Sequence, residues 1–215
     1  ILVIASSAVS TTIGKTRKIS DVSPTERARS LAEESNLDEN FTEIVIQEAD
    51  RVFETFDKCI LTLKDGMIRI NAGVDRTNVP KGKVLTLPED SENIAKTFRE
   101  AFKNEIGKDV GIVISDSHVN PLRRGTTGQA LGTSGLNEVV DCRNQSDLYD
   151  RKLQITFRGI GDQLAAASQL VMGEADERIP AVLVKDAENF LGDNGKDLKI
   201  SPDECAYGDL LDYNE

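Results

Sequence analysis

Short apolar runs separated by polar turns indicate the strands of this chain. Three runs are unbroken and too short for helices: residues 1–5, 110–114 and 180–184. The run at 110–114 is rich in β-branched residues and predicts a strand buried on both faces, and 180–184 predicts a last buried strand. Residues 153–157 alternate between apolar and polar side chains, which predicts a half-exposed strand. A tight turn at 64–66, ending in a glycine between two apolar segments, predicts an antiparallel hairpin.

Apolar positions spaced three and four residues apart indicate the helices. One helix is expected to open at Ser23 as N-cap, with Pro24 in its first position. Three more follow at about 41–53, 91–106 and 161–172. Gly173 is expected to end the last of them as a C-cap. The run of serine and threonine at 6–15 is interpreted as a polar loop.

Helices and strands are interleaved, but a tight hairpin is incompatible with a purely parallel sheet. The pattern therefore predicts an α+β fold with mixed sheets and flanking helices. One domain is expected over residues 1–185, followed by a loosely held C-terminal tail at 186–215. The first residues already read as a strand and lack a starting methionine, so we expect an N-terminal part of the fold to be missing.

Composition narrows the function classes. The formal net charge is −11, with 37 acidic against 26 basic residues, which argues against non-specific nucleic-acid binding. No apolar run is long enough to span a membrane, and no signal-peptide pattern is present. The three cysteines, Cys59, Cys142 and Cys205, are widely spaced and predict free thiols in a reducing compartment. We therefore expect a cytoplasmic protein with no membrane or nucleic-acid partner.

Three acidic residues come just after expected regular elements: Asp75, Asp116 and Glu174. Ser117 adds a hydroxyl next to Asp116. Oxygen ligands of this kind suit Mg²⁺ or Mn²⁺ together with phosphates, whereas a single histidine excludes a zinc site built from histidines. A polar exit from the buried strand is the alternative interpretation of Asp116. A Ser–His–acid hydrolase using His118 is the other enzyme class, although the G-x-S-x-G motif is absent.

Four segments together resemble the coenzyme F420-0:L-glutamate ligase (gamma-glutamyl ligase) family. They are Asn71-Ala-Gly-Val-Asp-Arg-Thr-Asn78; Ile114-Ser-Asp-Ser117 with Pro121 and Arg124-Gly125; Asp147-Leu-Tyr with Arg151 and Leu153; and Leu170-Val-Met-Gly-Glu174 through Ile179-Pro-Ala-Val-Leu-Val184. The likeness covers roughly residues 1–185. It implies a gamma-glutamyl-ligase-like fold that assembles as an intertwined homodimer.

The resemblance also implies an activity. Such ligases join L-glutamate through a gamma-linked amide to coenzyme F420-0, a deazaflavin-type acceptor, using GTP and a divalent metal, Mg²⁺ or Mn²⁺, by way of an acyl phosphate. By this likeness Asp75, Asp116, Ser117 and Glu174 match metal ligands. The implied nucleotide contacts are Ser6, Ser7, Asn78, Met172, Gly173, Ala175, Asp176, Glu177, Arg178 and Ile179.

The chain departs from the family pattern at several positions. Thr11 stands where the family usually has a lysine, and Val119-Asn120 replace Gly-Arg. Asp150 replaces a glycine, and Gln163 replaces an acid. Other cations can substitute near phosphates or substrate: Lys15, Arg123 and Arg124. These departures leave two alternatives open, a family member that ligates an amino acid to a different carboxylate acceptor and a non-catalytic metal- or nucleotide-binding homologue.

Overall fold

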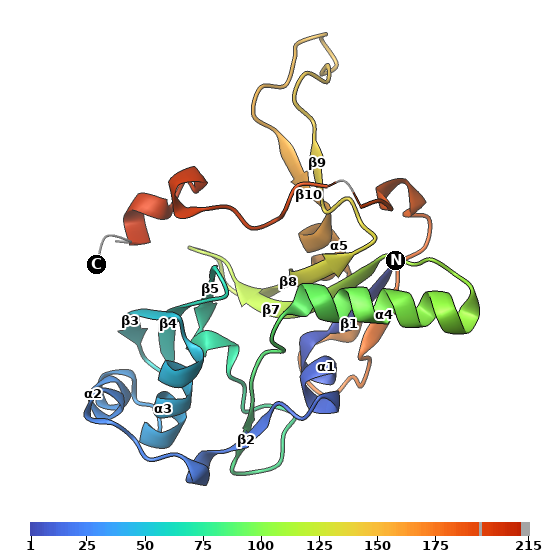
Figure 1. Ribbon diagram of the computed structural model, residues 1–215. Coiled ribbons are helices and arrows are strands. Elements are labelled where there is room, and N and C mark those ends of the chain that lie inside the picture. Colours follow the sequence, from blue (N-terminus) through green and yellow to red (C-terminus); the bar gives the residue numbers. More distant parts are fainter. Residues whose placement is uncertain (194, 212–215) are drawn as a thin grey trace. The chain divides into compact units, whose positions relative to one another are not determined.

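The computed structural model describes residues 1–193 and 195–211 and shows a mixed α+β protein with two compact units (Figure 1). Unit 1 comprises the described residues of 1–6, 89–117 and 126–198, and unit 2 comprises those of 7–88, 118–125 and 199–211. Asn194 and residues 212–215 of the predicted tail lie outside the described residues. Among the described residues, no helix has both the length and the apolar character needed to cross a membrane.

Unit 1 is built on a four-stranded sheet with the order β11-β1-β7-β8. Its strands are β1 (Leu2–Ala5), β7 (Ile112–Val119), β8 (Thr126–Ser134) and β11 (Ala181–Leu183). The parallel pairing of β1 with β7 sets Ile4 beside Ile114 and Ala5 beside Ser115, whereas β11 runs antiparallel to β1. The central strand β7 begins with fully buried residues, as its apolar run predicts.

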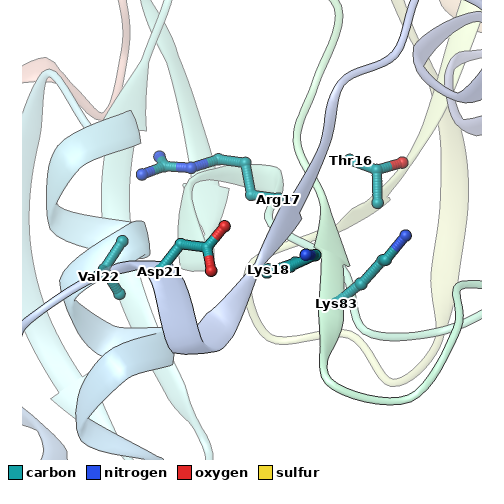
Figure 2. A pocket seen from close by; sticks show the side chains of 6 residues that line it. All are labelled: Thr16, Arg17, Lys18, Asp21, Val22 and Lys83. Carbon is teal, nitrogen blue, oxygen red and sulfur yellow. The ribbon is translucent and has the colours of Figure 1, made fainter.

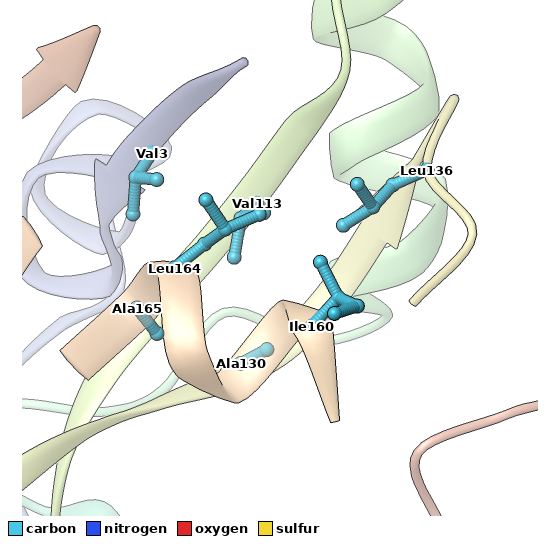
Figure 3. Close-up of a cluster of buried hydrophobic side chains, with 7 residues drawn as sticks. All are labelled: Val3, Val113, Ala130, Leu136, Ile160, Leu164 and Ala165. Atoms are coloured by element: carbon cyan, nitrogen blue, oxygen red, sulfur yellow. The ribbon is translucent and has the colours of Figure 1, made fainter. Parts of the chain in front are cut away.

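Helices α4 (Ser91–Ile106) and α5 (Ile160–Met172) pack against β8. A core of small and branched side chains fills the space between α5 and the sheet (Figure 3), and its members are Val3, Val113, Ala130, Leu136, Ile160, Leu164 and Ala165. Two glycines of β8 let the helix backbones approach closely. A Cβ atom at Gly128 would lie 2.4 Å from the carbonyl carbon of Ala165, and one at Gly132 would lie 2.4 Å from that of Ser91.

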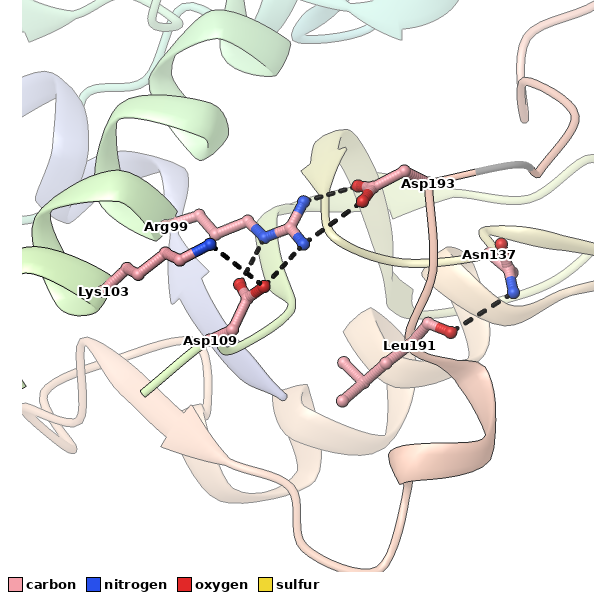
Figure 4. Close-up of polar contacts among 6 residues, drawn as sticks. All are labelled: Arg99, Lys103, Asp109, Asn137, Leu191 and Asp193. Carbon is pink, nitrogen blue, oxygen red and sulfur yellow. Dashed lines mark hydrogen bonds and ion pairs between the residues drawn. The ribbon is translucent and has the colours of Figure 1, made fainter. Parts of the chain in front are cut away.

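Residues 186–193 and 195–198, from the predicted C-terminal tail, belong to unit 1. The Asn137 N–H donates to the carbonyl of Phe190 at 2.8 Å. Arg99 of α4 forms ion pairs with Asp109 at 2.7 Å and with Asp193 at 2.5 Å (Figure 4). Asp193 thus has an ion-pair partner that composition alone does not reveal.

Unit 2 combines a helical pair with two small sheets. Its elements are α1 (Ser6–Thr12), β2 (Thr16–Lys18), α2 (Glu26–Ser35), α3 (Glu39–Glu48), β3 (Arg51–Phe56), β4 (Cys59–Lys64), β5 (Met67–Ile70) and β6 (Lys83–Leu85). β3, β4 and β5 form an antiparallel meander, and β2 pairs with β6. The core is apolar: Phe41, Ile44, Val45, Ile60, Ala72, Val74 and Val84.

Several predicted elements are confirmed. α4 spans the predicted 91–106, α5 ends at Gly173 as its C-cap, and the hairpin turns at Asp65-Gly66, where both residues adopt positive φ. The first helix is displaced, because Thr25 rather than Ser23 is the N-cap. Thr25 accepts from the Ala28 N–H, and its own N–H and hydroxyl both donate to the Glu43 carboxylate, at 2.8 and 2.7 Å.

Other predicted boundaries are wrong. The predicted loop at 6–15 holds helix α1, in which the hydroxyls of Thr11 and Thr12 donate to carbonyls four residues earlier. The predicted helix at 41–53 ends at Glu48, and its last residues enter β3. The predicted strand at 153–157 is largely irregular, since β10 begins only at Phe157 and covers Phe157–Gly159, pairing with β9 (Val139–Asp141). β11 is an exposed edge strand rather than a buried one.

Candidate functional site

Strand β7 carries the first two candidate residues, Asp116 and Ser117. The sequence predicts that the strand stops at Ser115, but β7 continues to Val119, so both side chains lie on the strand itself. Parallel pairing sets Ala5, the last residue of β1, opposite Ser115, so Ser6 at the start of α1 lies next to Asp116. The Ser6 hydroxyl donates to Asp116 Oδ1 at 2.6 Å. The sheet thus fixes the position of the carboxylate.

Ser117 faces a different neighbour, because successive side chains of a strand point to opposite faces. Its hydroxyl donates to both carboxylate oxygens of Glu174, at 2.9 and 3.0 Å. Glu174 follows Gly173, which caps α5 in a conformation with φ of 71° that favours glycine. The end of α5 therefore delivers the Glu174 carboxylate to the outer half of β7.

Two further side chains complete what we call the Glu174 cluster, which consists of Ser117, Thr126, Gln169 and Glu174. The Thr126 hydroxyl donates to Glu174 Oε1 at 3.0 Å. The Gln169 amide nitrogen donates to Ser117 Oγ at 3.1 Å and also to the Glu174 carboxylate. Three side chains, from β7, β8 and the last turn of α5, thus converge on the Glu174 carboxylate. Ser117, Thr126 and Glu174 are exposed and Gln169 is half-buried, so a ligand can reach the carboxylate.

Asp75 belongs to unit 2, where it is held in a tight turn. Its carboxylate accepts from the Thr77 N–H at 2.8 Å and from the Thr77 hydroxyl at 2.5 Å, while its backbone pairs with Leu85. Asn78, three residues on, adopts positive φ. Within residues 1–193 and 195–211, no group of three or more histidine, cysteine and acidic side chains forms a metal-binding cluster. The four-residue ligand set therefore stays a prediction.

The segment after α5 is an exposed loop whose backbone N–H groups bind one of the loop's own carboxylates, that of Glu177. The Ala175 N–H donates to Glu177 Oε2 at 2.8 Å. Backbone N–H groups of Ala175, Glu177 and Glu174 lower the pKa of the Glu177 carboxyl. Only glycine at position 173 leaves room for this arrangement, because a Cβ atom there would collide with the Glu177 carboxylate. The loop thus presents N–H groups in a pattern that holds an anion.

Comparison with known proteins identifies the family. The model of the F420-0:Gamma-glutamyl ligase family matches residues 1–186. The chain belongs to this family. Similar proteins named Coenzyme F420:L-glutamate ligase include one from Methanopyrus kandleri, 39% identical over 86% of this chain and 74% of the relative. One from Archaeoglobus fulgidus is 34% identical over 86% of this chain and 74% of the relative. One from Methanocaldococcus jannaschii is 35% identical over 95% of this chain and 82% of the relative.

The remaining predicted residues of this gamma-glutamyl ligase family member lie in separate surroundings. Arg123 and Arg124 are exposed in the turn between β7 and β8, where the Arg123 N–H donates to the Asn120 carbonyl at 3.2 Å. The backbone of Lys15 connects α1 to the segment after β6, accepting from the Thr86 N–H at 3.1 Å. Burial, assisted by Arg69, lowers the pKa of His118, which keeps its imidazole neutral at pH 7.

Sequence reasoning missed two members of the Glu174 cluster in this family member. Thr126 lies in the Gly-Thr-Thr-Gly run, which reads as a turn but forms the start of β8. Gln169 lies in the last turn of α5, five residues before Glu174. The available signal was that Gln169 is a polar residue near the end of a helix made mostly of apolar and small residues. Such a residue lies close to the acid that follows the C-cap, here Glu174.

Proposed function

We propose that this protein ligates L-glutamate through a gamma-linked amide to coenzyme F420-0, using GTP and a divalent cation. Family membership over 186 residues supports the reaction class, and the relatives' names support the two substrates. The observation that carries the proposal is the Glu174 cluster. It brings Ser117 of β7 within hydrogen-bonding distance of an acid 57 residues away, both of which the family likeness marks as ligands.

The donor chemistry fits Mg²⁺ or Mn²⁺. Carboxylate and hydroxyl oxygens are hard ligands, and the Glu174 cluster contains neither histidine nor cysteine. Ser117 and Glu174 would hold the cation, and Asp75 and Asp116 are the further ligands that the family likeness implies. When bound, it would screen the negative charge of the nucleotide phosphates.

The nucleotide is assigned to Ser6, Ser7, Asn78 and the loop 172–179. Support comes from the loop itself, whose N–H groups already hold the carboxylate of Glu177 and thus suit a phosphate. In the proposed reaction, the γ-phosphoryl group passes from GTP to a carboxylate of the acceptor, and GDP leaves. The amine of L-glutamate then attacks the acyl carbon, loses a proton and expels inorganic phosphate. The protein's part is to position the reactants.

Incubation of the full-length protein with F420-0, L-glutamate, GTP and Mn²⁺ tests the proposal directly. Mass spectrometry should show the acceptor gaining one glutamyl residue, with GDP and phosphate formed in equal amounts. Parallel reactions omit Mn²⁺ or replace GTP by ATP. If the protein shows neither ligation nor Mn²⁺-dependent GTP binding by calorimetry, the proposal is abandoned. Only a non-catalytic homologue then remains.

A different acceptor is the second candidate, and Thr11 favours it. The family usually has a lysine there, whereas the Thr11 hydroxyl donates to the Ser7 carbonyl inside α1 and adds no cation. Val119-Asn120 depart from the pattern at the exposed end of β7. The same assay with other carboxylate acceptors separates the two candidates, because glutamate then appears on an acceptor other than F420-0.

Glu177→Gln is expected to tighten GTP binding about threefold, because the carboxylate no longer competes with phosphate for the loop N–H groups. Calorimetry with Mn²⁺ and GTP measures the change. Glu188→Gln is the matched control, since it makes the same change at an exposed position outside the loop. Weaker GTP binding by Glu177→Gln would contradict the idea that the side chain occupies a phosphate position.

We also propose a homodimer, supported by the arm between β9 and β10. Leu148, Tyr149 and Ile155 are 98%, 76% and 85% exposed there, although such side chains are normally buried. In a two-fold dimer, the same patch of each copy would be covered.

Replacing Leu148 and Ile155 by aspartate is expected to weaken self-association about 100-fold, because each charge would be buried without a partner. Sedimentation velocity at micromolar concentration should then show a monomer. Gln154→Asp places the same charge on an exposed polar position of the same arm and should leave the dimer intact. A dimer that persists in the double variant excludes this arm as the interface.

A further inference from the structure

Unit 2 contains a pocket of about 350 Å³ beside the β2–β6 ladder (Figure 2). Its lining residues are Thr16, Arg17, Lys18, Asp21, Val22 and Lys83. The family likeness assigns none of them to substrate, metal or nucleotide. Three of the six are cations in a protein whose net charge is −11. The concentration of positive charge therefore needs a physical reason.

Lys18 and Lys83 lie directly opposite each other, because the antiparallel register pairs Lys18 with Lys83 and Thr16 with Leu85. Like charges in opposed positions of a ladder destabilise it. Within the described part of the chain, neither lysine has an ion pair or a side-chain hydrogen bond. Asp21 also lines the pocket, but its carboxylate forms no ion pair with either lysine among the described residues, so the repulsion between them is not relieved by direct pairing.

Arg17 is different, because it already has partners. Its guanidinium donates to Glu48 Oε1 at 2.9 Å and to Gln47 Oε1 at 2.6 Å on α3. Arg17 extends to one side of β2, whereas Thr16 and Lys83 lie on the other side (Figure 2). Alternation along the strand puts Lys18 on the same face as Thr16. The unneutralised charge of the pocket therefore belongs to Lys18 and Lys83, next to the Thr16 hydroxyl.

We propose that this pocket binds a small dianion, a dicarboxylate or a phosphate group, between the ammonium groups of Lys18 and Lys83. Two flexible ammonium groups from adjacent strands reach both charges of such a ligand, and the Thr16 hydroxyl donates a further hydrogen bond. The pocket volume suits a molecule of this size. Binding removes the repulsion between the lysines, so the ligand also stabilises the β2–β6 ladder.

Calorimetry at low ionic strength tests the site with three probes, namely glutarate, L-glutamate and inorganic phosphate, each without nucleotide, metal or F420-0. A response to glutarate or L-glutamate identifies a dicarboxylate site, and a response to phosphate alone identifies a phosphate site. The affinity should fall as salt is raised, because screening weakens exposed charge pairs. The assay needs no turnover, and variants at the pocket distinguish binding there from binding of L-glutamate or phosphate at the proposed ligase site.

Variants locate the binding. Lys18→Gln and Lys83→Gln should each weaken the probe at least tenfold, and the double variant should not bind it. Lys81→Gln is the matched control, since Lys81 is exposed two residues before Lys83 and does not line the pocket. Without ligand, Lys83→Gln should melt at the same temperature as the unmodified protein or higher. Failure of all three probes, binding unchanged in the double variant, or a lower melting temperature for Lys83→Gln overturns the proposal.

Discussion

Asp116→Asn is expected to reduce kcat/KM for glutamate ligation at least a thousandfold, a loss of about 4 kcal/mol of transition-state stabilisation. The substitution keeps the size of the side chain and an oxygen that accepts from the Ser6 hydroxyl, 2.6 Å away. It removes the negative charge that the proposed cation needs. Because the fold keeps its hydrogen bond, the loss should fall on chemistry and not on stability.

Steady-state ligation assays and thermal unfolding of the same preparation separate these two effects. The melting temperature of Asp116→Asn should stay within a few degrees of the unmodified protein. The concentration of Mn²⁺ needed for half-maximal activity should rise. Asp186→Asn is the control, because Asp186 is exposed and its positive φ suits asparagine equally well. Activity within tenfold of normal, with unchanged Mn²⁺ dependence, would remove Asp116 from the site.

The parts of the fold that the sequence predicts well are those governed by local signals. α4 has a regular apolar spacing, and the hairpin at 64–66 has a glycine where the chain needs positive φ. α1 was missed because serine and threonine favour loops, whereas here Val9 is buried and the threonine hydroxyls bond within the helix. The end of α3 was missed because Phe53 continues the helical spacing but lies in β3.

The sequence allowed some of the residues of the site to be predicted, but not how they are placed relative to one another. The family likeness named Ser117 and Glu174 together, and the structure joins them by two hydrogen bonds. The family likeness could not show that Asp116 and Ser117 project from opposite faces of the sheet. This follows only once β7 is known to extend past Ser115. Thr126 and Gln169 depend on how β8 and α5 pack on that strand, which no local pattern encodes.

Gly128→Ala is expected to destabilise unit 1 by about 3 kcal/mol, the upper part of the range for overpacked cores. A Cβ atom at Gly128 would lie 2.4 Å from both the carbonyl carbon and the carbonyl oxygen of Ala165, and 2.8 Å from the nitrogen of Ala166. All three are backbone atoms, so no side-chain rotation relieves the clash. Relief requires α5 to move away from β8, and this movement opens the core around Ala130 and Leu164.

Gly159→Ala is the matched control for Gly128→Ala, because the added Cβ would meet side-chain atoms alone, the end of Leu198 at 3.3 Å and Asp162 Oδ2 at 3.9 Å. Chemical unfolding should show a large loss of stability for the first variant and little change for the second. Adding Ala165→Gly to Gly128→Ala should not restore stability, since the clash involves the Ala165 backbone and not its methyl group. Because α5 also carries Gln169 and leads to Glu174, its displacement should weaken Mn²⁺-dependent GTP binding under conditions where the variant is still folded. Gly128→Ala with unchanged stability would show that α5 and β8 do not approach each other as closely as this packing requires.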